Sequence, residues 1–243
     1  MNVVSRRMGT MKLRSSVMNE EMISSAELSR AACCNLGESF VTNPSVDVSY
    51  SDAATGAKQI KLLGLSGTYV QMLTENIPNY RGAASPYGLG YVPGPWMQSI
   101  QVSKGISSVK NGYEAITGQI NVEFKKPQLL EADWVSANLF ASSTNRYEAN
   151  ADATLKLSKR WSTSLLAHYE NETKAHDGND DGFVDIPQVE QYNVWNRWAY
   201  MGDHYVFQAG FKALSESRTS GQAHHTDMQT GDLYKVGIDT ERY

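Results

Sequence analysis

The stretch IQVSKGISSVKNGYEAITGQINVEFKKP, from Ile100 to Pro127, decides how the chain is divided. Its two ends read as β-strands, because β-branched residues alternate with polar ones, and the Gly and Ser residues between them are typical of turns. Upstream of Pro127 the chain mixes helix-like and short strand-like segments, whereas longer segments with period-two alternation follow it. The sequence therefore predicts an α+β region before Pro127 and an antiparallel β region after it.

The segments downstream of Pro127 place apolar and polar residues on opposite faces. The second segment is the clearest, with Tyr147, Ala149, Ala151, Ala153, Leu155 and Leu157 opposite Glu148, Asn150, Asp152, Thr154 and Lys156. Five further segments show the same period, at 135–142, 164–169, 191–200, 205–214 and 233–243. Most of these segments have about the 9 to 11 residues that a tilted strand needs to cross a bilayer.

The connections between these segments alternate in length. They are short at 142–145, 158–160 and 201–203, and long at 171–189 and 215–232. Short turns on one side and long loops on the other are typical of an outer-membrane barrel, and five aromatic residues near the segment ends would fit its girdles: Trp134, Trp161, Trp195, Trp198 and Tyr200. A soluble antiparallel sheet with one solvated face shows the same alternation, so the pattern alone leaves both open.

The region before Pro127 has weaker signals. We expect a short helix over 25–40 and strands over 46–50, 59–63 and 69–73. A loop rich in Gly, Pro and aromatic residues, NYRGAASPYGLGYVPGPW, then runs from Asn79 to Trp96.

The loop HDGNDDGFVDIP, from His176 to Pro187, resembles the first nine positions of an EF-hand. Its oxygen donors would be Asp177, Asn179, Asp181, Asp185 and the Phe183 carbonyl, with Gly182 at the sharp turn. Position twelve is Gln188 instead of the bidentate Glu, and strand-like sequence flanks the loop. A structural Ca²⁺ is one interpretation, and a solvated acidic turn is the other.

Composition and motifs exclude several classes of function. The 243 residues have a formal net charge of -4, and no aromatic platform accompanies the scattered Lys and Arg residues, so we expect no nucleic-acid partner. The sequence contains no GxSxG, Walker or HExxH motif, and the chain is not expected to be an enzyme. No run approaches the roughly 20 apolar residues of a transmembrane helix.

Three smaller features have plain interpretations. The adjacent cysteines, Cys33 and Cys34, are expected to be small buried residues, because a disulfide between neighbours is strained. His224 and His225 could contact a metal-containing ligand, although a surface His pair is more often solvated. The basic segment 1–16 is not followed by an apolar run, so it does not read as a signal peptide.

The segment from Ile100 to Pro127 resembles the end of the plug domain of TonB-dependent outer-membrane receptors. The shared features are a strand ending in Lys-Gly, a Ser-rich turn, a Gly-aromatic step, and Gly-Gln-Ile-Asn leading into a last strand. The sequence from Ile23 to Pro78 is similar to the front of the same plug in receptors of the Bacteroidetes type. It departs from many relatives at Glu75-Asn76, where they carry Asp-Gly.

This resemblance implies an α+β plug inserted into a barrel of about 22 antiparallel strands. We therefore expect an N-terminal extension over 1–22, a plug over 23–127, and about six strands of an incomplete transmembrane β-barrel over 128–243. Because six strands would leave two open edges in lipid, the chain is expected to be a fragment. No TonB-contact box is recognisable in residues 1–22, which puts energy coupling by this chain in doubt.

The resemblance also implies a function. It predicts a receptor in the Gram-negative outer membrane that takes up a scarce ligand, such as a siderophore, cobalamin, metal chelate or glycan, with TonB, ExbB and ExbD as energy-coupling partners. The ligand-contacting candidates at the plug apex are Tyr80, Arg81, Tyr87, Tyr91 and Trp96, although each could instead pack against its surroundings. A calcium-ordered acidic loop would shape the outer surface, and no other cofactor is expected.

Two other functions are compatible with parts of the sequence. One is a soluble β-sandwich that binds surfaces in a Ca²⁺-dependent manner, and the plug-like segment argues against it. The other is a hydrolase that uses Asp177, Asp181 and Glu172 as acids, but two of these carboxylates lie in one local loop instead of converging from separate elements.

Overall fold

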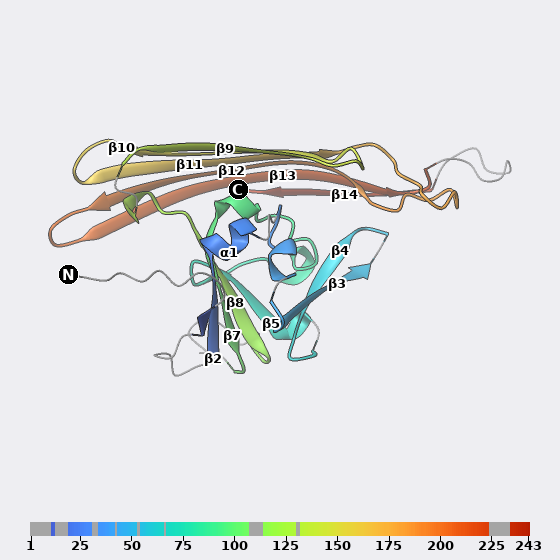
Figure 1. The fold of residues 1–243 in the computed structure, drawn as a ribbon, viewed down its shortest axis with the longest axis horizontal. Helices are drawn as coiled ribbons and strands as arrows, with labels where there is room; N and C mark the ends of the chain where they lie inside the picture. Colours follow the sequence, from blue (N-terminus) through green and yellow to red (C-terminus); the bar gives the residue numbers. More distant parts are fainter. Residues whose placement is uncertain are drawn as a thin grey trace. The chain divides into compact units, whose positions relative to one another are not determined.

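The computed structural model describes residues 11–12, 19–30, 34–41, 43–52, 54–65, 67–106, 114–129, 132–223 and 234–243. The chain forms two compact units, and each is described by itself (Figure 1). Unit 1 contains Met1–Ser51 and Lys58–Lys125, and unit 2 contains Asp52–Ala57 and Lys126–Tyr243. The division after Lys125 lies two residues before the predicted boundary at Pro127.

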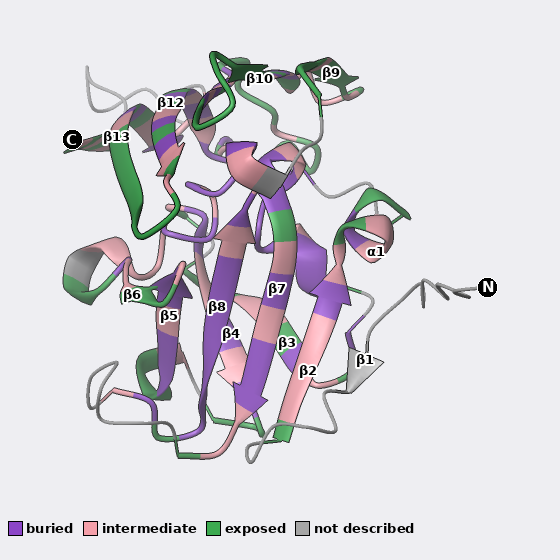
Figure 2. Cartoon of the chain, turned by 90° about the vertical axis from the view of Figure 1, so that its left-hand side faces the viewer, coloured by how far each residue is buried: buried purple, intermediate pink, exposed green. Residues whose placement is uncertain are grey.

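Unit 1 is built on a mixed sheet with the strand order β1-β2-β7-β8-β5-β6, in which only the β5–β8 pair is parallel. The strands span Met11–Lys12 (β1), Asn19–Ser24 (β2), Val70–Thr74 (β5), Ile77–Pro78 (β6), Met97–Lys104 (β7) and Gly118–Phe124 (β8). Figure 2 shows β7 and β8 side by side, with β8 almost wholly buried. The apolar residues of IQVSKG and GQINVEF thus form the centre of the core.

A separate hairpin and several short helical turns complete unit 1. The hairpin pairs β3 (Val46–Asp52) with β4 (Ala57–Leu62). The helical elements are α1 (Ser25–Arg30), η1 (Glu38–Phe40), η2 (Gly67–Tyr69), η3 (Gly82–Ala84) and η4 (Gly94–Trp96). Among the described residues, no helix has both the length and the hydrophobicity of a membrane-spanning helix.

The prediction of one helix over 25–40 is wrong over the described residues 34–40. The backbone of Leu36 donates to the Val92 carbonyl at 2.9 Å, and the Cys34 carbonyl accepts from Gly94 at 2.8 Å. These groups therefore bond to a distant segment and cannot complete the i to i-4 pattern of a helix. Tertiary pairing with 92–94 has overridden local helix propensity.

Unit 2 contains one antiparallel meander of six strands in the order β14-β13-β12-β11-β10-β9. The strands span Trp134–Ala141 (β9), Tyr147–Lys156 (β10), Trp161–Glu172 (β11), Gln188–Met201 (β12), Val206–Gly221 (β13) and Lys235–Arg242 (β14). The predicted order and number of strands are confirmed. The predicted long loop from 215 is corrected, because β13 continues to Gly221 and pairs with β14 from Leu214 onward.

The burial pattern of this sheet is inverted relative to a soluble protein. Along β10 the polar residues are buried, with Glu148 at 3% and Asn150 at 5% exposure, while Tyr147 is 50% exposed. The same inversion holds on β12, where Asn193 and Arg197 are buried between the exposed Tyr192 and Trp198. A soluble sheet buries its apolar face, so this sheet is suited to an apolar environment around its outer side.

Candidate functional site

Three of the five aromatic and Arg candidates in segment 79–96 belong to the core of unit 1. Tyr80, Tyr91 and Trp96 are at most 4% exposed. The rings of Tyr80 and Tyr91 lie 6.0 Å apart, and Trp96 meets Phe124 edge to face at the same distance. These three rings pack inside unit 1 and do not face solvent. Of the five candidates for ligand contact, the accessible ones are therefore Arg81 and Tyr87.

Tyr80 owes its position to two backbone features. It follows β6 with a φ of +53°, a conformation uncommon for an aromatic residue. Its side chain lies directly on Gly88, where an added Cβ would be only 2.5 Å from the Tyr80 Cβ. A larger residue at 88 would displace the ring, so this glycine is required for packing.

Arg81 and Tyr87 are the two candidates that are not buried. The Arg81 guanidinium makes a bidentate ion pair with Glu114, with N to O distances of 2.7 to 2.9 Å. Both side chains remain partly exposed, at 45% and 31%. Arg81 therefore presents a fixed guanidinium at the surface of unit 1, which is the geometry that suits recognition of a carboxylate or phosphate.

The acidic loop is closed by its own backbone. The Asp177 carboxylate accepts hydrogen bonds from the amides of Asp181 and Gly182, at 3.2 and 2.8 Å. The Asp185 carboxylate accepts from the Gly178 amide at 2.7 Å. Positive φ angles at Asp180 and Gly182 allow the tight turn.

The loop also extends the sheet of unit 2. Phe183 forms an isolated antiparallel bridge with Gln222, and the amide of Val184 donates to the Gly221 carbonyl at 2.9 Å. Across the part of the chain that the structure describes, no three His, Cys, Asp or Glu side chains are grouped to hold a metal ion. The carboxylates of Asp177 and Asp185 accept hydrogen bonds from amides of the loop itself, and a structural Ca²⁺ at this loop stays a prediction.

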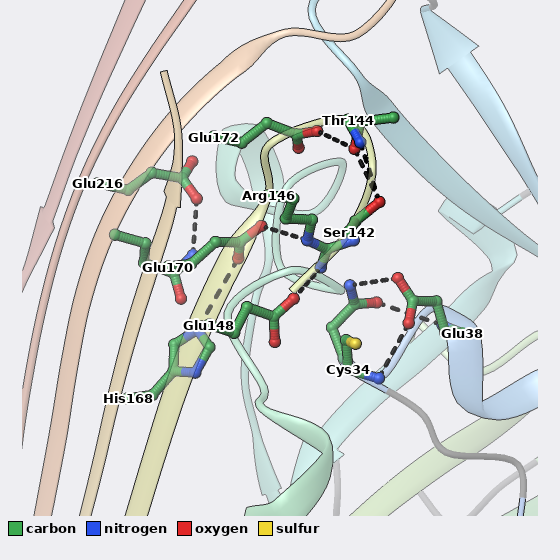
Figure 3. A network of polar contacts seen from close by, with 12 residues as sticks. Cys34, Glu38, Ser142, Thr144, Arg146, Glu148, His168, Glu170, Glu172 and Glu216 are labelled. Atoms are coloured by element: carbon green, nitrogen blue, oxygen red, sulfur yellow. Dashed lines mark hydrogen bonds and ion pairs between the residues drawn. The ribbon is translucent and has the colours of Figure 1, made fainter. Parts of the chain in front are cut away.

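A polar network follows the buried face of unit 2 (Figure 3). Arg146 contacts Glu148 at 2.6 Å and Glu170 at 3.0 Å, where the two glutamates face each other across the β10–β11 pair. His168, one position further along the same face of β11, contacts Asn150 through Nδ1 at 2.8 Å. Each buried carboxylate therefore has a cationic or hydrogen-bonding partner, as burial of charge requires.

The network continues across the next strands. Gln191 donates to Glu216 at 2.7 Å, and Arg218 contacts the same glutamate at 3.2 Å. Sequence analysis placed Glu148 and Asn150 on the polar face but did not single out a functional group there. The period-two pattern showed which residues share the polar face. It could not show which of them form ion pairs or hydrogen bonds, because those pairs depend on the strand register, which is set by tertiary structure.

Other predicted positions carry less information. His224, His225, Cys33 and Gly112 lie outside the described residues. Cys34 is buried, as expected for a small core residue, and its backbone amide donates to Glu38 at 2.9 Å.

Part of unit 1 matches a known protein family, and the fold of the chain matches solved structures. The family model described as TonB-dependent Receptor Plug Domain matches residues 12–119. No curated protein matches the sequence. Among solved structures, the pyoverdine outer membrane receptor FpvA from Pseudomonas aeruginosa PAO1 is similar, with a TM-score of 0.67 and 15% identity over 86% of this chain.

Two further receptors show the same likeness. The ferric yersiniabactin uptake receptor FyuA from Yersinia pestis has a TM-score of 0.64 and 16% identity over 87% of this chain. The ferric-catecholate import receptor Fiu from E. coli K12 has a TM-score of 0.62 and 18% identity over 85% of it. This chain spans 28%, 33% and 28% of the lengths of these three structures, in the order given.

The plug match, the mixed sheet of unit 1 and the exposed apolar face of unit 2 all fit the same architecture, a plug followed by strands of a membrane barrel. At these identities the solved structures establish the fold, and the family model assigns the first unit. Residues 12–119 match the TonB-dependent receptor plug domain, and the described chain has the fold of such a plug followed by antiparallel strands like those of the solved receptor β-barrels.

Proposed function

We propose that the protein carrying this chain is a TonB-dependent receptor that takes up a scarce ligand across the outer membrane. The ligand would bind the outer loops and the plug, and TonB with ExbB and ExbD would supply the energy that opens a path. The observation that carries the proposal is the plug domain joined to a sheet with its polar face buried and its apolar face exposed. This is the arrangement that a plugged transmembrane barrel requires.

The ligand class follows less directly. The similar solved structures are receptors for pyoverdine, ferric yersiniabactin and a ferric catecholate, which supports a ferric siderophore as the first ligand to test. Cobalamin, other metal chelates and glycans are the remaining candidates, because one fold serves many ligands.

The soluble, Ca²⁺-dependent β-sandwich has no support from the structure. A sandwich would pack the apolar faces of two sheets together. In unit 2 the apolar face carries exposed residues such as Leu139 and Leu165, while the polar face is buried.

Uptake assays test the proposal. Iron-limited cells with and without the gene would be given ⁵⁵Fe complexes of a catecholate, a hydroxamate and citrate, and ⁵⁷Co-cyanocobalamin. We expect gene-dependent uptake of one probe, and its loss in a strain without TonB or after addition of a proton uncoupler. Gene-dependent uptake that survives both treatments would contradict energy coupling.

Fractionation provides a separate check. An antibody against the segment from Ser103 to Lys125 would detect the native protein in cell fractions. We expect the signal in the outer-membrane fraction, in a form whose gel mobility changes on heating, as for a folded barrel. A signal confined to the soluble fraction would overturn the receptor assignment.

A further inference from the structure

A cavity of about 190 Å³ lies within unit 1 and has no role in the function described so far. Its walls come from three segments of the chain: the hairpin residues 51 and 58–60, the turn that leads into β5 at 67–72, and the segment 82–89. The lining residues are Ser51, Lys58, Gln59, Ile60, Gly67, Thr68, Val70, Met72, Gly82, Ser85, Pro86 and Leu89.

The walls of this cavity are held in place without a ligand. The Lys58 amide donates to the Pro86 carbonyl at 2.9 Å, which ties β4 to segment 82–89. Gly67 approaches β4 so closely that an added Cβ would be 3.1 Å from the Ile60 carbonyl oxygen. Ile60, Val70 and Leu89 are buried and supply an apolar floor. The cavity is therefore preformed, as most small-molecule sites are.

The charge of the lining selects one class of ligand. Among the twelve described residues that line the cavity, Lys58 is the one with a titratable side chain, and it is cationic. Its ammonium lies 5.5 Å from the centre of the Tyr50 ring, within the range of a cation–π contact that orients the side chain. Three hydroxyls and one amide, from Ser51, Thr68, Ser85 and Gln59, can hydrogen-bond a polar group beside it. An anionic group next to an apolar body complements this lining.

The size of the cavity limits how much of a ligand it can hold. Its volume is smaller than the about 300 to 1,000 Å³ of pockets that enclose a drug-sized molecule. We propose that it is a subsite for a carboxylate-bearing arm, with an apolar or aromatic body, of the ligand that the receptor imports, and that Lys58 contacts the carboxylate. This inference deepens the proposed function and rests on it for the identity of the whole ligand.

Benzoate and its neutral isostere benzamide are the probes that test the subsite. Both would be titrated into the full protein, purified in detergent, with binding followed by ligand-observed NMR. We expect benzoate to bind about tenfold more tightly than benzamide, because the Lys58 ammonium makes a stronger, charge-assisted hydrogen bond to a carboxylate than to a neutral amide. The Lys58→Met variant keeps the aliphatic stem and removes the charge, so it should bring the two affinities together.

Lys61→Met is the matched control, because Lys61 lies on the same strand and does not line the cavity. It should keep the preference for benzoate. Equal affinities for benzoate and benzamide in the unchanged protein would overturn the proposal, as would a preference that survives Lys58→Met. The bound probe would be located from the NMR chemical shifts of the labelled backbone amides of Gly67 and Tyr87, because Gly67 lines the cavity and Tyr87 follows the lining residue Pro86. Shifts confined to other regions of the protein would also overturn the proposal.

The outcome is separable from that of the uptake assay. Probe binding needs neither TonB nor a proton gradient, so it can succeed where transport fails. If benzoate binds through Lys58 but no gene-dependent uptake occurs, the subsite stands and the transport proposal falls. If uptake is TonB-dependent but benzoate shows no preference, the receptor stands and this cavity is not its anion subsite.

Discussion

Gly118, at the start of β8, shows how tightly single residues are constrained in unit 1. An added Cβ would lie 2.2 Å from the Ser103 carbonyl oxygen and 2.4 Å from Leu62 Cδ2. Its φ of +156° also disfavours a side chain. Gly105 shares a positive φ, at +92°, but an added Cβ there meets nothing within 4 Å. A substitution at Gly105 would therefore introduce backbone strain alone, whereas one at Gly118 would add a steric clash to the strain.

We expect Gly118→Ala to destabilise the plug by about 3 kcal/mol, because overpacking adds to backbone strain. Gly105→Ala should cost about 1 kcal/mol, from strain alone. Hydrogen-exchange protection of the β7 and β8 amides would measure both changes. Equal losses in the two variants would show that the contact with Ser103 does not limit residue 118.

Glu21 anchors the strand β2 to the rest of unit 1. Its carboxylate contacts the Lys104 ammonium at 2.6 Å and accepts from the Ser45 hydroxyl at 3.0 Å. Partial burial raises the pKa of Glu21, but the hydrogen bonds from Lys104 and Ser45 outweigh it, so the pKa lies below the ordinary value of 4.5. Because the folded pKa is lowered, the stabilisation is present above about pH 4.5 and is lost as pH falls through the folded pKa.

Glu21→Gln should lower the stability of β2 by about 1 kcal/mol at pH 7, the usual contribution of one such contact. The difference from the unchanged protein should shrink as the pH is lowered below 4.5 and the carboxyl group becomes protonated, measured as the ratio of exchange protection for β2 amides. Glu27→Gln is the control, since its partner Arg30 is largely exposed. A difference that stays constant over the whole acidic range would exclude the ionised carboxylate as its cause.

Arg81 offers a ligand contact that can be tested apart from folding. Its ion pair with Glu114 is partly exposed, so Arg81→Ala should change the stability of the plug by no more than about 1 kcal/mol. If Arg81 contacts an anionic ligand, the same change should lower affinity for the imported probe by at least about tenfold. Val41→Ala, at an exposed residue that does not line the proposed subsite, controls for general surface effects. Unchanged affinity in Arg81→Ala would remove it from the candidates.

At the scale of elements, the long acidic loop at 176–187 could be ordered by a bound Ca²⁺ or by its own hydrogen bonds. The sequence left open a Ca²⁺-ordered loop and a solvated acidic turn, and in the structure backbone amides of the loop donate to Asp177 and Asp185. Since these bonds need no ion, Asp177→Ala should raise the rate of proteolysis within 176–187, and the chelator EGTA should not. Asp203→Ala, in a short turn of the same unit, is the control. Faster cleavage of the unchanged protein in EGTA would instead support a structural Ca²⁺.

The helix expected over 25–40 shows that a local sequence pattern does not predict backbone pairing with a distant segment. Residues 25–30 do form a helix, but the backbone of Cys34 and Leu36 pairs with 92–94. Nothing within 25–40 encodes that partner, which lies more than fifty residues away. The strands of unit 2 were predicted more accurately, because a meander pairs neighbours in sequence and its period-two pattern is local.

At the scale of the whole molecule, the exposed apolar face of unit 2 should lie against lipid. Leu165, in the middle part of β11, is 46% exposed, and a Lys near the bilayer midplane costs about 2 to 4 kcal/mol. Leu165→Lys should therefore reduce the amount of heat-modifiable protein in the outer membrane. Tyr205→Lys is the control, because Tyr205 stacks on Tyr200 just before β13, at an end of the sheet where charge costs little. Equal loss in both variants would argue against lipid contact along this face.

The sequence by itself determined the order of the strands in unit 2 and the alternation of Tyr147, Glu148, Ala149 and Asn150 along β10. These features are local, since they depend on side-chain period and turn chemistry over a few residues. Only the tertiary structure decided that the polar face of the sheet is the buried one, and that Tyr80, Tyr91 and Trp96 are core residues. Burial depends on which distant segments pack together, and that information is spread over the whole chain.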